Sequence, residues 1–150
     1  MKTLKVNDNF LNSAFDNEWR VFMNVFRKKG FEELIYTESL WLFMEDEEDV
    51  PNNLRVEGDL AISGNITHLP QRMHITGDLD IADAVINQPL SNVYIGRDLL
   101  VVRSPLREIT DDVIIKGNIY ISNPELILIP DNLKNKIIST QDAINTLNKW

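Results

Sequence analysis

Two histidines, His68 and His74, are the side chains of this sequence best suited to act as a general base. The chain has no cysteine, and a serine or threonine nucleophile normally needs a base held beside it. His68 falls in a turn before Pro70, and His74 falls at an outward position of a repeating unit described below. We therefore expect both to be surface residues, and the sequence predicts no catalytic residue, no metal site, no cofactor and no enzymatic activity.

Three aspartates, Asp59, Asp78 and Asp98, recur at nearly constant spacing, with Ser39 and Asn118 at the positions before and after them. A stack of carboxylates could bind calcium, but calcium needs six to eight oxygen ligands, and calcium-binding β-rolls carry a denser repeat of glycine and aspartate. The simpler interpretation is that these side chains accept hydrogen bonds from turn amides.

These aspartates belong to an internal repeat of about 20 residues. Segments 56–62, 75–81, 95–101 and 115–121 superpose, and their central apolar residues are Leu60, Leu79, Leu99 and Ile119. Stepping back 20 residues reaches Leu40, so segment 36–42 adds a fifth unit in degraded form. A repeat of this length indicates a stacked, solenoid-like fold.

Each unit has the pattern of a turn, a short strand, a corner and a second strand. In the clearest unit, Leu54 and Val56 mark the first strand and Leu60 and Ile62 the second, with Gly58 at the corner. Alternation with period two places these apolar residues inside. The corner glycines Gly58, Gly77 and Gly117 are expected to have positive φ. One coil cannot bury its own apolar edge, so the coils must stack and their ends must be capped.

Helical caps are expected at both ends. Apolar residues recur at helical spacing near the N-terminus, with Asn7 or Asp8 as N-cap and Gly30 as the stop. Thr140 could cap a short helix from 141 to about 149. The predicted fold is therefore mainly β with helical caps, a short β-solenoid of about five 20-residue coils. It forms one domain, 1–150, with an N-terminal cap helix in 1–30, repeat coils in 31–135 and a C-terminal cap in 136–150.

Segment 58–70 resembles the 20-residue leucine-rich repeats of bacterial type III secreted effectors, which run Leu-x-Val-Ser-x-Asn-x-Leu-x-x-Leu-Pro. Asn65 and Ile66 match the Asn and the following Leu, whereas later coils carry other residues there. The leucine-rich-repeat-like stretch covers about 31–135, and similar repeats occur in bacteriophage and bacterial proteins of undefined role. The resemblance implies recognition of proteins by the outward strand face. The effectors' ligase activity is not implied, because it needs a separate domain with a cysteine nucleophile.

The chain is acidic, with a net charge of −8. Residues 1–30 carry six basic and three acidic side chains, so the negative charge belongs to the repeat body. Its densest acidic patch is Glu45, Asp46, Glu47, Glu48 and Asp49. Direct binding to nucleic acid is disfavoured, because phosphate neutralisation needs a basic face. The sequence has no apolar run long enough to span a membrane and no signal-peptide pattern, and with no cysteine we expect a cytoplasmic protein of a bacterium or a phage-infected cell.

An outward column on the second strands is the best functional signal in the sequence. It contains Trp41, Ala61, Asp80, Leu100 and Tyr120, and the direction of the neighbouring column that begins at Phe43 is left open. Apolar and aromatic side chains on a water-facing sheet mark interfaces. The predicted partner-binding residues are Trp41, Leu100 and Tyr120, with Tyr94 at their border.

Two functions follow from these features. The first is a non-catalytic protein–protein interaction module that binds a protein partner or itself as a homodimer. The alternative is a small acidic, phage-type inhibitor of a nucleic-acid-binding or host-defence protein, which acts by charge mimicry through Glu45 to Asp49.

Overall fold

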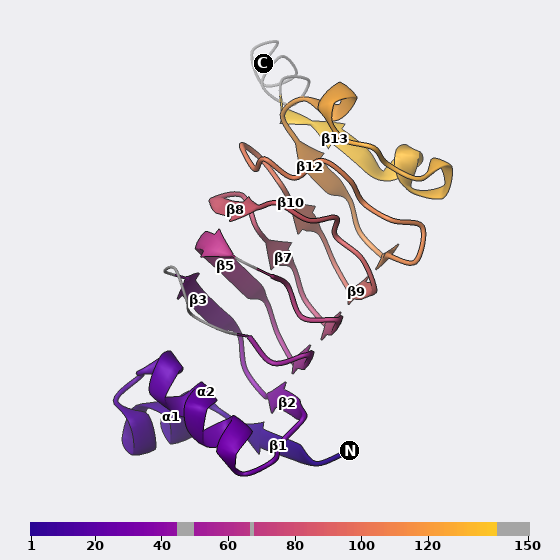
Figure 1. The fold of residues 1–150 in the computed structure, drawn as a ribbon. Helices are drawn as coiled ribbons and strands as arrows, with labels where there is room; N and C mark the ends of the chain where they lie inside the picture. Colours follow the sequence, from indigo (N-terminus) through magenta and orange to yellow (C-terminus); the bar gives the residue numbers. More distant parts are fainter. Residues whose placement is uncertain (45–49, 67, 141–150) are drawn as a thin grey trace.

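A computed structural model describes residues 1–44, 50–66 and 68–140 of the chain. In this structure the chain forms a β-solenoid whose coils stack in chain order, with a helical region at the N-terminal end (Figure 1). Five coils each contribute one strand to each of two parallel sheets. The predicted solenoid is confirmed, including its degraded coil around Leu40.

The two sheets collect equivalent strands from successive coils. The first sheet contains β1 (Thr3–Val6), β2 (Glu33–Tyr36), β4 (Asn53–Val56), β6 (Arg72–Ile75), β9 (Val93–Ile95) and β11 (Ile114–Ile115). The second sheet contains β3 (Leu40–Met44), β5 (Leu60–Ile66), β7 (Leu79–Asp80), β10 (Leu99–Leu100), β12 (Ile119–Ile121) and β13 (Ile137–Ser139). A further strand, β8 (Ala84–Ile86), pairs with the end of β5.

The interior is a continuous column of apolar side chains. Leu60, Leu79, Leu99 and Ile119 are aligned by the strand register, and each is fully buried. Strand β4 shows the expected alternation, because Leu54 and Val56 are buried while Asn53 and Arg55 are partly exposed. Each coil therefore buries its apolar residues against the same positions of the coils before and after it.

Hydrogen bonds between coils run along the Gly-Asp corner. At successive steps, a side-chain oxygen of one coil accepts a backbone N–H of the next. The steps are Asp59 N to Ser39 Oγ at 2.9 Å, Asp78 N to Asp59 Oδ1 at 2.7 Å, Asp98 N to Asp78 Oδ1 at 2.9 Å and Asn118 N to Asp98 Oδ1 at 2.7 Å. This corner ladder bears out the expectation that these side chains accept hydrogen bonds from turn amides.

The corner glycines are needed for space. Among the described glycines, positive φ occurs at Gly30, Gly58 and Gly64, so the expectation of positive φ was wrong for Gly77 and Gly117. A Cβ on Gly77 would lie 2.1 Å from Oδ1 of Asp59, too close for any side chain. Glycine here leaves room for the carboxylate of the preceding coil.

The N-terminal region is more elaborate than the single cap helix predicted for 1–30. Strand β1 extends the first sheet by pairing with β2. Two helices follow, α1 (Asp8–Phe15) and α2 (Trp19–Lys28), and they are separated by Asp16 and Asn17, which both have positive φ. Oδ1 of Asn7 accepts the N–H of Phe10 at 2.9 Å, so Asn7 is the N-cap of α1.

The helices bury an aromatic cluster against the end of the solenoid. Phe22 lies at its centre, with ring centroids 5.3 Å from Phe15 and 5.5 Å from Trp19. Phe22 and Phe26 are almost completely buried, as the capping role requires. The helical region thus closes the N-terminal end of the apolar column.

At the other end, the second sheet continues beyond residue 135, where we expected the coils to end. Two short 3-10 helices, Pro124–Leu126 and Asp131–Lys136, lead to β13, which pairs with β12. The expected helix from 141 to about 149 lies outside the described residues. No helix in the described part of the chain has both the length and the apolar character needed to cross a membrane.

Candidate protein-interaction surface

The predicted stripe exists as a column on the second sheet. The strand register aligns Trp41, Ala61, Asp80, Leu100 and Tyr120 in that order, one from each of the five coils. Their strands lie side by side, from β3 near the helices to β12 (Figure 1). The structure therefore brings together three of the four predicted partner-binding residues on one face.

Exposure is concentrated at the N-terminal end of this column. Trp41 is 73% exposed, whereas Leu100 and Tyr120 are only partly exposed. Phe43, whose direction the sequence left open, also faces outward and is 69% exposed. Two large aromatic side chains on β3 are thus the most prominent apolar feature of the sheet, and we call them the β3 aromatic pair.

Tyr94 does not belong to this stripe. It lies on β9 in the first sheet, so the expectation that it borders the stripe was wrong. There it stacks on His74, with ring centroids 4.4 Å apart and an interplanar angle of 13°. The register places Ile35, Arg55 and Ile114 in the same column.

The acidic patch Glu45, Asp46, Glu47, Glu48 and Asp49 lies outside the described residues. Its predicted role therefore stays a prediction of the sequence. Other acids, which the sequence did not single out, lie beside the β3 aromatic pair.

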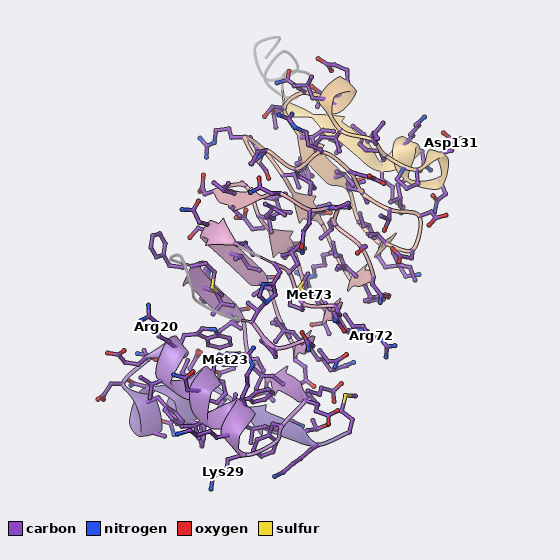
Figure 2. The ribbon with its side chains drawn as sticks, in the orientation of Figure 1. Arg20, Met23, Lys29, Arg72, Met73 and Asp131 are labelled. Atoms are coloured by element: carbon purple, nitrogen blue, oxygen red, sulfur yellow. The ribbon has the colours of Figure 1, made fainter. Side chains whose placement is uncertain are left out.

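A groove separates the helical region from β3. It has a volume of about 750 Å³ and is lined on one side by the segment from Asp16 to Val21 and on the other by all five residues of β3. Figure 2 shows Arg20 at the end of the helical region nearest β3. A second, smaller hollow of about 340 Å³ continues from the β3 aromatic pair toward Asp80 and Asp83.

The charge along these two hollows is negative. Their described lining holds five carboxylates and one guanidinium, those of Asp8, Asp16, Glu18, Asp80, Asp83 and Arg20. Asp8 accepts a hydrogen bond from the hydroxyl of Tyr36, and Asp83 lies 3.3 Å from Arg103. Within the described residues, no cationic side chain forms an ion pair with Asp16, Glu18 or Asp80. The surface beside the aromatic pair therefore carries uncompensated negative charge.

The histidines lie apart from this surface. His68 is an exposed residue directly before Leu69 and Pro70, while His74 is partly buried on the first sheet. Burial lowers the pKa of His74, and the neighbouring Arg55 guanidinium lowers it further. In residues 1–44, 50–66 and 68–140, no group of three or more His, Cys, Asp or Glu side chains is placed to hold a metal ion.

Register alone could have located the aromatic pair. The run Leu40-Trp41-Leu42-Phe43-Met44 alternates between buried and exposed side chains, and the inward position of Leu40 fixes both Trp41 and Phe43 as outward. The groove left no comparable signal in the sequence, because it depends on how the helices sit against β3.

The repeat architecture rests on the strand register described above. Comparisons with known proteins find no matching family model, no matching curated protein and no matching solved structure.

Proposed function

We propose that this chain is a non-catalytic protein-interaction module that binds a protein partner through the β3 end of its second sheet. One observation carries the proposal: Trp41 and Phe43, two successive outward positions on one strand, are 73% and 69% exposed. Large aromatic side chains dominate binding energy at protein interfaces when they are desolvated by a partner. Leaving two of them in water beside a groove serves no purpose in the packing of the solenoid.

The resemblance of segment 58–70 to leucine-rich repeats agrees with this proposal, because such repeats bind proteins through their outward strand face. In our proposal Trp41 and Phe43 are the anchors of the interface, and Leu100 and Tyr120 extend the contact area beyond them. Both are only partly exposed, so they contribute less binding energy than the β3 aromatic pair.

The test is an affinity measurement with the partner retained from source cells by the full chain. Replacing the anchors in the double variant Trp41→Ser/Phe43→Ser should weaken binding by about thirtyfold or more, the ratio that corresponds to about 2 kcal/mol. The matched control is Leu126→Ser/Leu128→Ser, because these residues are 56% and 71% exposed but lie outside the second sheet. Equal binding by the two double variants would refute the proposal.

Self-association is the second arm of the same experiment. Sedimentation of the full chain would show a dimer if the partner is a second copy, and the anchor variant would then be a monomer while the control variant stays dimeric.

Charge mimicry by the acidic patch is the alternative function, and the uncompensated Asp16, Glu18 and Asp80 beside the β3 aromatic pair favour an acidic surface. It predicts that binding disappears when Glu45 to Asp49 are replaced by Gln and Asn, and that Trp41→Ser/Phe43→Ser binds like the original chain. The two proposals thus give opposite results for the anchor variant.

A further inference from the structure

We infer that the edge of β3 is a strand-addition site for an extended segment of a partner protein whose side chains alternate between apolar and basic. The inference rests on the proposed function and deepens it, since it names the conformation and chemistry of the segment that is bound.

The first step concerns the unequal ends of the two sheets. The first sheet begins with β1, but the chain then forms α1 and α2 where a solenoid would place the corresponding strand of the second sheet. As a result β3 pairs with β5 on one side, and no strand of the described chain pairs with its other side. An unpaired strand edge is a template for strand addition unless it is covered or blocked.

The second step identifies the backbone groups at this edge. Leu40 N–H donates to the Asp59 carbonyl at 2.8 Å, and Leu40 is in register with Leu60. In a parallel pair, alternate residues of a strand bond to the same neighbour, so Leu40, Leu42 and Met44 bond toward β5. The N–H and C=O groups of Trp41 and Phe43 therefore point to the opposite edge. Within the described residues, neither of these two donates to or accepts from the helices through its backbone.

The third step is access. The groove of about 750 Å³ lies along this edge and is lined by Leu40 to Met44. The rings of Trp41 and Phe43 stand beside it and are largely in water. A segment lying in the groove could pair with the backbone of β3 and bury its apolar side chains against these rings, which is the recognition mode of β-augmentation.

The fourth step is charge, which selects the occupant. Asp16, Glu18 and Asp80 line the two hollows without ion-pair partners in the part of the chain described, and Arg20 is the one cation there. Lysine or arginine in the bound segment would neutralise these carboxylates. A second copy of this chain would bring the same acids to the edge and a net charge of −8, so it fits poorly.

The probe for the test is an acetylated and amidated eight-residue peptide that alternates valine and lysine. We expect it to bind the full chain, to shift the amide signals of Trp41 and Phe43 in NMR spectra, and to lose about tenfold or more in affinity between low and high salt. The same peptide with an N-methyl group on every backbone nitrogen should not bind, because it cannot pair as a strand. The valine–glutamate peptide should not bind either. Equal binding by either of these two control peptides would overturn the inference.

Protein variants separate the backbone from the side chains. Phe43→Pro removes an N–H that faces the groove, whereas Phe43→Val removes the same ring and keeps that N–H. Proline is tolerated on a sheet edge, and circular dichroism checks that both variants fold. We expect Phe43→Pro to bind the valine–lysine peptide about tenfold more weakly than Phe43→Val. Equal affinities would show that no strand is added.

Two matched double variants test how much the negative charge of the groove contributes to peptide binding. Asp16→Asn/Glu18→Gln should weaken peptide binding several-fold, whereas Glu125→Gln/Asp131→Asn removes the same charge at the distant C-terminal end and should leave it unchanged. Equal loss in both would overturn the assignment of basic residues to this groove.

The two proposals fail in different ways. If the natural partner is lost by Trp41→Ser/Phe43→Ser but bound equally by Phe43→Pro and Phe43→Val, the interaction surface stands and strand addition is wrong. If the partner tolerates Trp41→Ser/Phe43→Ser, the proposed function itself fails.

Discussion

Oδ1 of Asp59 accepts a hydrogen bond from the backbone N–H of Asp78, the equivalent residue of the next coil, at 2.7 Å. The same bond recurs between Asp78 and Asp98 at 2.9 Å and between Asp98 and Asn118 at 2.7 Å. Each carboxylate is thus bound by an amide of the following coil, and a bond to an ionised acceptor is stronger than one between neutral groups. This offsets the mutual repulsion of stacked aspartates and ties the corners together.

Removing one carboxylate of the corner ladder should destabilise the solenoid. Asp98→Ala leaves the N–H of Asn118 without its partner, and we expect a loss of about 1–2 kcal/mol in the free energy of unfolding. Asp98→Asn keeps an oxygen acceptor and should lose less. Asp111→Ala is the control for the removal of an exposed negative charge. Urea unfolding measures all three, and equal values for Asp98→Ala and Asp111→Ala would contradict the role of the ladder.

Gly64 should tolerate a side chain much less than Gly30. Both have positive φ, 89° and 80°, so alanine at either position is strained by about 1–2 kcal/mol. At Gly64 the new Cβ would also lie 2.1 Å from the carbonyl oxygen of Met44, whereas nothing lies within 4 Å at Gly30. We expect Gly64→Ala to lower the free energy of unfolding by at least about 2 kcal/mol more than Gly30→Ala. Similar values in thermal and urea unfolding would show that β3 moves easily away from β5.

The fold could be predicted because the repeat is encoded at several independent positions of every coil. Leu60, Leu79 and Leu99 fix the period, and the Gly-Asp corner fixes where each coil turns. Strand β1 was missed because Leu4 and Val6 show the same alternation but lead into a helix instead of a corner. The helix break at Asp16 was missed because the apolar spacing continues through it, and the left-handed backbone of Asp16 and Asn17 leaves no periodic signal.

The candidate site was predicted in part, for a related reason. Strand register specifies which residues share a column, so Trp41, Leu100 and Tyr120 were placed correctly on one face. How exposed each side chain is depends on the neighbouring strands. Leu100 and Tyr120 have a strand on each side and are only partly exposed, whereas Trp41 lies on an edge strand. Tyr94 was misplaced because both sheets have outward columns, and the repeat pattern does not say how the two faces are oriented.

The pKa of His74 should lie below the usual histidine value. Its burial under the Tyr94 ring disfavours the charged imidazolium, and Arg55 opposes it further, so the folded pKa lies below 6.5. Because the pKa is lowered, the neutral imidazole contributes to the free energy of unfolding above the pKa of the unfolded state. This contribution is lost as pH falls through the folded pKa. NMR titration of the imidazole signals measures the midpoint, and Arg55→Gln should raise it. A midpoint at or above 6.5 in the original chain would contradict the buried, stacked arrangement.

Tyr36 should make the protein sensitive to alkaline pH. Its side chain is only 1% exposed, and burial together with the hydrogen bond to the Asp8 carboxylate raises the pKa of its hydroxyl far above the usual value of about 10. A raised pKa means that the stabilisation is complete below the unfolded pKa and is lost as pH rises toward the folded pKa, because only the unfolded state releases the proton. At pH 8 the original chain should therefore exceed Tyr36→Phe in free energy of unfolding by about 1 kcal/mol.

The difference in free energy of unfolding between the original chain and Tyr36→Phe isolates Tyr36, since all other titrating groups are common to both. This difference should shrink between pH 8 and pH 11, and its sign can reverse near pH 11, because phenylalanine has no proton to lose. Urea unfolding at the two pH values measures it. A difference that is constant across this range would mean that the Tyr36 hydroxyl ionises equally well in the folded protein, and that its contact with Asp8 does not hold the first coil against α1.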